Sequence, residues 1–336
     1  MLYKILNHPI SKITITSVFV FGLAIVIVPE WFNFSPRYNY FAIQIMFGYF
    51  LSGLLFLMLR QKTLMSMSFL CCALLCFYLK LAVDVESQGF NILRRESPDA
   101  VKKEVPTQFS VAHFNLGAGN TEKDVLASIR TADADLVSIQ EIRLDLLKKL
   151  TDSLDLTYHF HHTLGDIRMM GMGIFTKKSL VTFDTIYHKH LANPCGTISV
   201  GNKGEKVHFI TTNTLPALNE QSFAKLREHL HTLTLHLDTL DSPVIALGDF
   251  NAAPWSNIIK EFESHTDLRD SRVGFMSSFT GGTTSILGAP LNHIFYSKHL
   301  KCMDFETIYS PNFTFSGIKG IYEFKSLPPN ASKSYQ

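Results

Sequence analysis

The feature that most constrains this chain is a group of three apolar segments within its first 83 residues. They cover residues 13–28, 38–59 and 63–83, and only the short stretches 29–37 and 60–62 separate them. The second segment alone has 22 uncharged residues, and a helix of about 20 residues crosses the hydrocarbon core of a bilayer. We therefore predict that residues 1–83 form a membrane anchor with three transmembrane helices.

The first apolar segment also fits other interpretations. It has only 16 residues before Pro29, and Lys4 and Lys12 precede it, as in a secretory signal peptide. No small-x-small cleavage site follows, because the chain continues VPEWF at 28–32, which favours a short spanning or signal-anchor helix. Buried core helices are the alternative for all three segments, and the close succession of the segments disfavours it.

Basic residues near the apolar segments indicate an orientation. Equal numbers fall on the two sides of the predicted membrane, with Lys4, Lys12, Arg60 and Lys62 on one and Arg37, Lys80, Arg94 and Arg95 on the other. The first group lies closest to the helix ends, where the positive-inside rule acts. We therefore expect the N-terminus inside and the large C-terminal domain outside.

The remainder of the chain is close to neutral. Up to residue 83 there are six basic residues and one acidic residue, which leaves 25 basic and 28 acidic residues beyond it. Proteins that hold long nucleic acid usually present a basic face, because phosphate neutralisation supplies much of the affinity. A nucleic-acid partner is therefore not favoured.

The five cysteines carry little information. Cys71, Cys72 and Cys76 lie in the third apolar segment, while Cys195 and Cys302 are isolated and lack metal-ligand spacing. A disulfide between Cys195 and Cys302 stays open as an alternative if the domain is exported.

Beyond the anchor, we predict a polar linker at 84–106, a domain at 107–326 and a flexible tail at 327–336. Within the domain, short β-type runs alternate with helical patterns, which favours a layered α/β domain. The expected strands are 109–114, 136–139, 173–176, 207–212, 244–247, 293–296 and 320–324, and the expected helices are near 121–132, 144–154, 221–240 and 256–263.

Polar residues follow three of these apolar runs. Asp249 and Asn251 end the segment VIALGDFN at 244–251, Glu141 ends LVSIQE at 136–141, and Asn115 ends VAHFN at 111–115. Carboxylate and carbonyl-type oxygens are the ligands of a hard cation such as Mg²⁺. A turn in which Asp249 and Asn251 serve only backbone hydrogen bonds is the alternative.

Taken together, the segments FN at 114–115, QE at 140–141 and GDFNAAPWS at 248–256 resemble the endonuclease/exonuclease/phosphatase superfamily. Further matches are residues 171–177, Pro243 and PLNHIFYS at 290–297. The resemblance implies a four-layer α/β sandwich over about 107–324. Bacterial members also carry a three-helix anchor, so we expect a multi-pass protein of the bacterial inner membrane with a periplasmic C-terminal domain.

The resemblance also assigns roles. Glu141 would be the principal metal ligand, with Asn115 beside it contacting the metal or the phosphate. Asp249 would orient the attacking water, and Asn251 would donate to the phosphoryl oxygens. The implied cofactor is Mg²⁺ or Mn²⁺, which acts as a Lewis acid and template.

Four other positions depart from the family pattern. Asn213 replaces a histidine, Asn292 an aspartate, Gly317 an aspartate and Ile318 the catalytic histidine. Isoleucine cannot accept a proton, and a general acid or base typically contributes about 10² to 10⁴ in rate. Four histidines are candidate substitutes, although each is expected to be structural or solvent-facing: His113, His161, His162 and His293.

Two functions therefore stay open, and so does the question of whether the chain is an enzyme. The first is a membrane-anchored, metal-dependent phosphoester hydrolase-like protein with an impaired or altered active site, acting on a lipid head group or a small phosphoester. The alternative is a catalytically inactive pseudoenzyme that binds phosphate and metal as a sensor or interaction module. Both require Asn115, Glu141 and Asp249 to converge.

Overall fold

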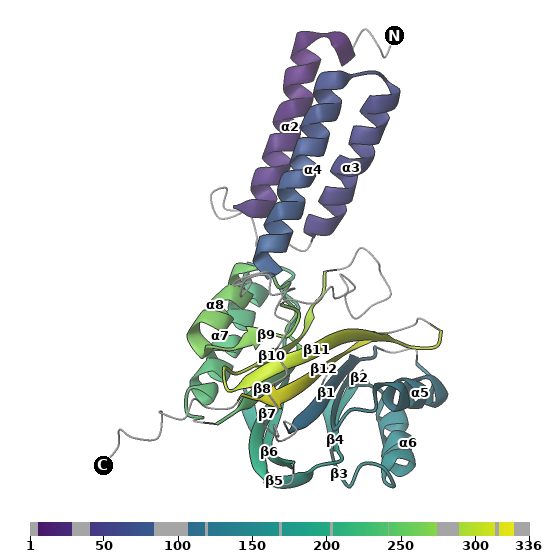
Figure 1. Cartoon of the computed structure of the whole chain (residues 1–336), viewed down its shortest axis with the longest axis vertical. Coiled ribbons are helices and arrows are strands. Elements are labelled where there is room, and N and C mark those ends of the chain that lie inside the picture. Colours follow the sequence, from purple (N-terminus) through teal and green to yellow (C-terminus); the bar gives the residue numbers. More distant parts are fainter. Residues whose placement is uncertain are drawn as a thin grey trace, which may run out of the picture.

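A computed structural model gives the arrangement of the chain (Figure 1). It describes residues 6–28, 41–83, 107–117, 120–167, 170–201, 204–240, 242–273, 289–312 and 316–325. The predicted linker at 84–106 and the predicted tail at 327–336 lie outside the described residues.

Three apolar helices stand together at one end of the molecule (Figure 1). They are α2 (Pro9–Ile27), α3 (Ala42–Met58) and α4 (Lys62–Val83). Among the helices that the structure describes, only α2 and α4 are long and apolar enough to cross a membrane. The lengths differ from the prediction because Pro9 begins α2 before Lys12, whereas α3 is a helix of 17 residues. Of the three predicted transmembrane helices, two are therefore long enough to cross a membrane.

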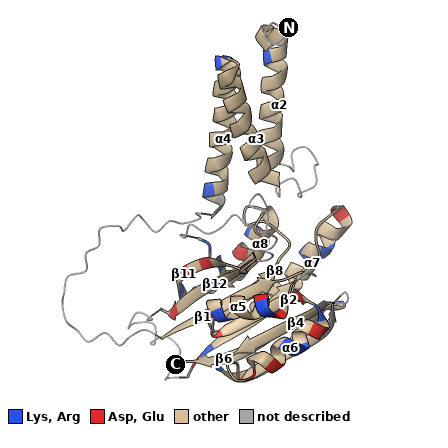
Figure 2. Cartoon of the chain, turned by 90° about the vertical axis from the view of Figure 1, so that its right-hand side faces the viewer, with Lys and Arg blue, Asp and Glu red and all other residues tan. Residues whose placement is uncertain are grey.

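The outer surfaces of these helices are apolar. The described residues 6–28 and 41–83 contain no acidic residue, and Figure 2 shows only isolated basic residues on the helices. Met58 is 81% exposed, and only 6% and 28% of the apolar windows of α2 and α4 are buried. A core helix of a soluble domain would bury such residues, so the core-helix alternative is disfavoured.

The remaining elements form two six-stranded sheets. The first has the order β11 (Leu300–Tyr309), β12 (Ser316–Phe324), β1 (Gln108–Asn115), β2 (Leu136–Ile142), β4 (Met170–Thr176) and β3 (Phe160–Ile167). The second has the order β5 (Ser179–His188), β6 (Leu191–Val200), β7 (Glu205–Asn213), β8 (Val244–Asp249), β10 (Asn292–Tyr296) and β9 (Arg269–Asp270). Strands β1 and β2 are parallel, as are β7 and β8. The remaining pairings among these strands are antiparallel.

Helices cover the outer face of each sheet. Helices α5 (Glu122–Ala132) and α6 (Leu144–Leu154) pack on the first sheet, and α7 (Glu220–Leu237) and α8 (Asn257–Thr266) on the second. The caps follow from the sequence: the Thr121 side chain accepts from the backbone N–H of Asp124, and Asn219 and Ser222 form a capping box. The predicted α/β sandwich of two sheets is confirmed.

Alternation along the central strands places apolar side chains on both faces of each sheet. In β1, Phe109 and Val111 join the cluster between the sheets, whereas Ala112 and Phe114 join the cluster under α5 and α6. The cluster between the sheets also holds Ile245, Leu247 and Ile318. Cys195 and Cys302 are both free thiols, so the disulfide alternative is wrong.

We expect Leu247→Ala to lower the free energy of unfolding by about 2 to 5 kcal/mol, because it leaves a cavity between the sheets. Leu247 is fully buried, whereas Leu156 is 94% exposed, so Leu156→Ala is a matched control with an effect within about 0.5 kcal/mol. Denaturant unfolding of the full chain in detergent micelles, followed by circular dichroism, measures both. Equal effects would contradict this assignment of the core.

Candidate functional site

The site candidates lie at the carboxyl ends of the two parallel strand pairs. Asn115 ends β1 and Glu141 lies near the end of β2, whereas Asn213 ends β7 and Asp249 ends β8. Parallel strands finish at the same edge of a sheet, and the two sheets face each other, so these ends meet across the sandwich.

Asp249 is the centre of a hydrogen-bond network. Its Oδ2 accepts from Asn115 Nδ2 at 2.7 Å, and its Oδ1 accepts from the backbone N–H of Asn251 at 2.8 Å. The Asn251 amide in turn donates through Nδ2 to the carbonyl of Thr214, also at 2.8 Å. These bonds bring Asn115, Asp249 and Asn251 together and fix their orientation.

The backbone is strained at this site. Glu141 has φ 54° and Asn251 has φ 48°. These values lie in the left-handed region, which residues other than glycine rarely adopt. The pairing of β2 with β4 shifts register between Ile139 and Ile142, and Glu141 lies within this irregularity. Gly248 has φ 141°, and a Cβ there would meet the Thr212 carbonyl oxygen at 1.9 Å. Strained residues of this kind gather at functional sites.

The electrostatics of the site favour a bound cation. Burial raises the pKa of Asp249 to about 7 and the nearby Glu141 charge adds to this, although the bonds from Asn251 and Asn115 oppose it. Neither carboxylate forms an ion pair within the part of the chain that is described. A bound metal ion would reduce the repulsion between two neighbouring carboxylates that lack a compensating cation.

The donor set fits a hard divalent ion. Among the described residues there is no group of three or more histidine, cysteine, aspartate or glutamate side chains that could hold a metal. Glu141, Asn115 and Asp249 instead offer carboxylate and amide oxygens, and Mg²⁺ is commonly held by one or two carboxylates with water and phosphate completing its shell. The roles of these residues as ligands stay a prediction.

Two of the four positions that were predicted to depart from the family pattern lie directly beside Asp249. Asn213 is its neighbour on β7 and Asn292 its neighbour on β10. The other two lie on β12, where Gly317 pairs with Phe114 and Ile318 with His113. A Cβ on Gly317 would come within 2.3 Å of the Phe114 ring, and the Ile318 side chain packs in the cluster between the sheets. Apolar packing therefore surrounds both Gly317 and Ile318.

None of the four candidate histidines hydrogen-bonds to Asn115, Glu141 or Asp249 within the described part of the chain. The fully buried His113 places Nδ1 3.3 Å from Ser138 Oγ and Nε2 3.3 Å from Asn292 Oδ1. His161 and His162 lie on β3, an edge strand of the first sheet.

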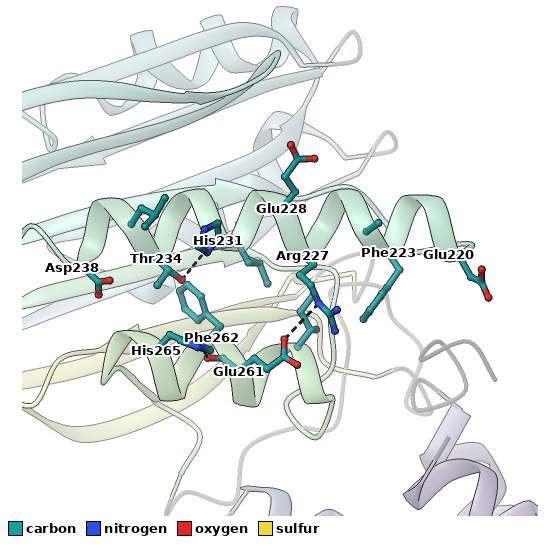
Figure 3. Close-up of a pocket in the computed structure, with 14 residues that line it drawn as sticks. Glu220, Phe223, Arg227, Glu228, His231, Thr234, Asp238, Glu261, Phe262 and His265 are labelled. Atoms are coloured by element: carbon teal, nitrogen blue, oxygen red, sulfur yellow. Dashed lines mark hydrogen bonds and ion pairs between the residues drawn. The ribbon is translucent and has the colours of Figure 1, made fainter. Parts of the chain in front are cut away.

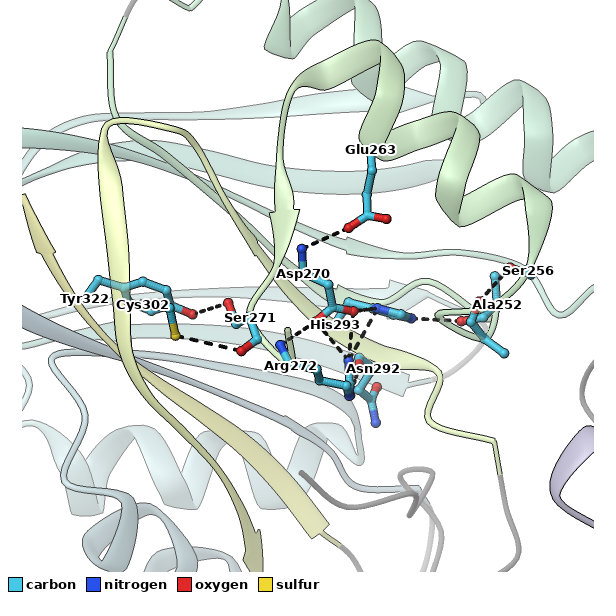
Figure 4. Close-up of polar contacts among 11 residues, drawn as sticks. Ala252, Ser256, Glu263, Asp270, Ser271, Arg272, Asn292, His293, Cys302 and Tyr322 are labelled. Carbon is cyan, nitrogen blue, oxygen red and sulfur yellow. Dashed lines mark hydrogen bonds and ion pairs between the residues drawn. The ribbon is translucent and has the colours of Figure 1, made fainter. Parts of the chain in front are cut away.

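His293 instead supports the loop that follows β8 (Figure 4). Its Nδ1 lies 2.6 Å from Asp270 Oδ2 and its Nε2 lies 2.8 Å from the Ala252 carbonyl oxygen, so both ring nitrogens are occupied. Burial would raise the pKa of Asp270, but the charges of Arg272 and His293 outweigh it and lower that pKa to about 2. Sequence reasoning missed Asp270 and Arg272; the segment DSR after α8 gave no signal of this contact.

A separate groove of about 640 Å³ lies between α7 and α8 (Figure 3). It is lined by residues such as Phe223, Leu230 and Phe262, and Arg227 Nε lies 3.6 Å from Glu261 Oε2 across it. None of the predicted site residues lines this groove.

With this geometry in place, the chain can be compared with known proteins. A model of the Endonuclease/Exonuclease/phosphatase family matches residues 112–313, which is more than half of the chain. Comparison with curated protein sequences finds no match. The domain is thus of the class of two-sheet α/β sandwiches with acidic and amide side chains at the strand ends. The chain belongs to the endonuclease/exonuclease/phosphatase family.

Similar solved structures share the fold. A family protein of Bacteroides vulgatus has 14% identity and a TM-score of 0.56, and the match covers 65% of this chain and 100% of that chain. The human Nocturnin catalytic domain, solved with a bound sulfate anion, has 18% identity and a TM-score of 0.52, covering 65% and 94%. A mannosyl-6-phosphatase of Bacteroides thetaiotaomicron has 17% identity and a TM-score of 0.52, covering 64% and 100%.

The buried His113 predicts a pH dependence of stability. Burial lowers its pKa from 6.5 to about 3, so the unfolded chain takes up this proton at higher pH than the folded chain. The free energy of unfolding should therefore fall as the pH drops from 6.5 towards 3, with about 1.4 kcal/mol per pH unit due to this residue.

Replacing the imidazole tests this assignment. His113→Asn should reduce the slope of unfolding free energy against pH, whereas the same change at the exposed His231 on α7 should leave it unaltered. Unfolding of the full chain in detergent micelles, followed at several pH values, measures the slope. An unchanged slope in His113→Asn would mean that His113 already binds its proton in the folded state.

Proposed function

We propose that this protein is a membrane-anchored member of the family that binds a phosphoester through a divalent cation, and that its capacity for hydrolysis is impaired. The observation that carries the proposal is the contrast between two halves of one site. Asn115 donates to Asp249 and the nearby Glu141 charge acts on Asp249, whereas Gly317 and Ile318 lie in apolar packing.

Glu141 and Asn115 are the residues that would hold Mg²⁺ or Mn²⁺, with Asp249 next to them. When bound, such an ion supplies a Lewis acid that neutralises charge on a phosphoryl group. By the family resemblance the Asn251 amide would donate to a phosphoryl oxygen, and its Nδ2 is oriented by its hydrogen bond to the Thr214 carbonyl. The Nocturnin domain, which shares this fold, was solved with a sulfate anion, and sulfate is a tetrahedral dianion like phosphate.

The proposed impairment follows from proton transfer. Asp249 can orient a water molecule, but a leaving group or a developing phosphorane charge needs a proton donor. Ile318 cannot provide one, and His113 is buried with both ring nitrogens engaged. Removal of such a group typically costs about 10² to 10⁴ in rate, so ligand retention is favoured over turnover.

The location at a membrane is the second part of the proposal. The exposed apolar surfaces of α2 and α4 support two spans, and α3, which lies between them in the sequence, completes a bundle whose three helices share one apolar cluster. The basic residues near the helix ends support an inside N-terminus and an extracytoplasmic domain in a multi-pass inner-membrane protein. The ligand would be a lipid head group or a small phosphoester, and nucleic acid is not favoured.

Metal binding tests the first half of the proposal. Glu141→Gln should weaken Mn²⁺ binding by about tenfold or more, since even substitution of residues that only support the ligands lowers metal affinity by about 10- to 100-fold. The exposed Glu220→Gln is a matched control that should bind as the wild type does. Electron paramagnetic resonance of free Mn²⁺, with the full chain in micelles, measures the affinity. Efficient hydrolysis of a generic phosphodiester that Glu141→Gln abolishes would contradict the proposed impairment.

Restoring the missing groups tests the second half. The triple variant Asn213→His, Asn292→Asp, Ile318→His should raise phosphodiester hydrolysis by about 10² to 10⁴ over the wild type, because it returns a positioned proton donor. Gly317 stays unchanged, since a side chain there meets Phe114. The same triple variant with Glu141→Gln is the control. If the triple variant keeps its circular dichroism spectrum but gains no rate, the missing base does not limit hydrolysis.

A further inference from the structure

The loop that carries the phosphate-binding residues is also the place where the domain meets the anchor. After Asn251, the chain runs through Trp255 into α8. The Trp255 side chain is fully buried and belongs to one apolar cluster with residues of all three anchor helices. The buried anchor members of this cluster are Val26, Ala42, Ile43, Tyr49, Cys71, Leu75 and Leu79.

Polar contacts reinforce this apolar contact. The Tyr78 hydroxyl of α4 donates to the Trp255 carbonyl oxygen at 3.4 Å. Lys260 of α8 places its Nζ 5.6 Å from the centre of the Tyr78 ring, a cation–π geometry. Inside the loop, Ser256 Oγ donates to the Ala253 carbonyl oxygen at 2.6 Å and fixes the turn beside Trp255. Tyr78 of α4 therefore contacts both the loop and α8.

The anchor residues near the loop come mainly from one end of the bundle. Val26 is next to the last residue of α2, Ala42 and Ile43 begin α3, and Tyr78 and Leu79 lie in the last two turns of α4. This is the end that faces the domain in Figure 1. A separate cluster of Leu6, Phe56 and Leu64 closes the opposite end.

Simple lengths place the site close to a membrane surface. The apolar span of α4 ends at Leu81, three residues beyond Tyr78 or about 4.5 Å along the helix axis. Asn251 precedes Trp255 by four residues, which reach at most about 14 Å. The head-group region of a bilayer is about 5 to 8 Å deep on each side. Asn251 is thus within a loop's length of the lipid phosphates.

We infer that the ligand of this site is the phosphate head group of a membrane lipid, drawn from the leaflet that faces the domain. This inference rests on the proposed function and names its ligand class. A soluble phosphoester carries the same phosphate group, but contact between the site loop and the end of the anchor would not increase its affinity. Lys80 in the last turn of α4 and Lys260 beside Tyr78 add positive charge near this level, which suits anionic lipid.

The first experiment locates the loop. The chain has two tryptophans, so Trp31→Phe leaves Trp255 as the only one. The full chain is placed in phosphatidylcholine nanodiscs that contain a nitroxide either on the head group or deep on the acyl chain. We expect the head-group nitroxide to quench Trp255 fluorescence more strongly than the deep one. Absence of quenching by both would place the loop away from the bilayer and overturn the inference.

The second experiment separates lipid from soluble ligand. In the same variant with Mg²⁺, Trp255 fluorescence is titrated with phosphatidic acid in the nanodisc or with glycerol 3-phosphate in solution. We expect a saturable change with phosphatidic acid at an apparent affinity about tenfold or more above that for glycerol 3-phosphate, because the anchor holds site and lipid in one surface. Asn251→Ala should abolish the change, and the exposed Asn312→Ala should keep it.

The two ideas fail in different ways. Equal or tighter binding of glycerol 3-phosphate would overturn the lipid inference and leave the proposed phosphoester function standing. Binding of neither ligand by a folded chain would overturn both.

Discussion

The side-chain amide of Gln140 joins the two sheets at the strand ends that carry the candidate site. Its Oε1 accepts from the backbone N–H of Asp249 at 3.1 Å, and its Nε2 donates to Thr211 Oγ1 at 3.0 Å and to the Thr212 carbonyl at 2.9 Å. Gln140 is fully buried, so an unpaired amide there would cost about 1 to 3 kcal/mol. The bridge fixes β2 against β7 and β8, and with them the distance between Glu141 and Asp249.

The site built on this bridge has two unlike halves. One half keeps carboxylate and amide oxygens on a strained backbone, a cost that a bound cation and phosphate would offset. In the other half, Ile318 adds to the packing between the sheets, and Phe114 occupies the space beside Gly317. The loop after β8 then couples the oxygen-rich half to helices α2, α3 and α4, because Trp255 belongs to the apolar cluster of these helices.

The accuracy of the sequence-based fold depended on where each strand lies in its sheet. All seven predicted strands exist, and they are β12, β1, β2, β4, β7, β8 and β10. The missed strands β3, β5, β9 and β11 are the edges of the two sheets. Edge strands are half exposed and lack a continuous apolar run; β5 alternates polar and apolar residues along an exposed surface. The missed β6 is buried, but Asn193, Pro194 and Gly196 hide it because they are unfavourable in strands.

The sequence by itself determined the apolar segments, the central strands, the family and the residue types at the strand ends, because these depend on local pattern and side-chain chemistry. Only the tertiary structure decided that Asn115 bonds to Asp249, that His113 and His293 are engaged elsewhere, and that Trp255 packs against the anchor. These contacts join residues more than forty positions apart in most cases. Their partners are selected by the packing of the sheets and helices, and a local pattern carries no information about that packing.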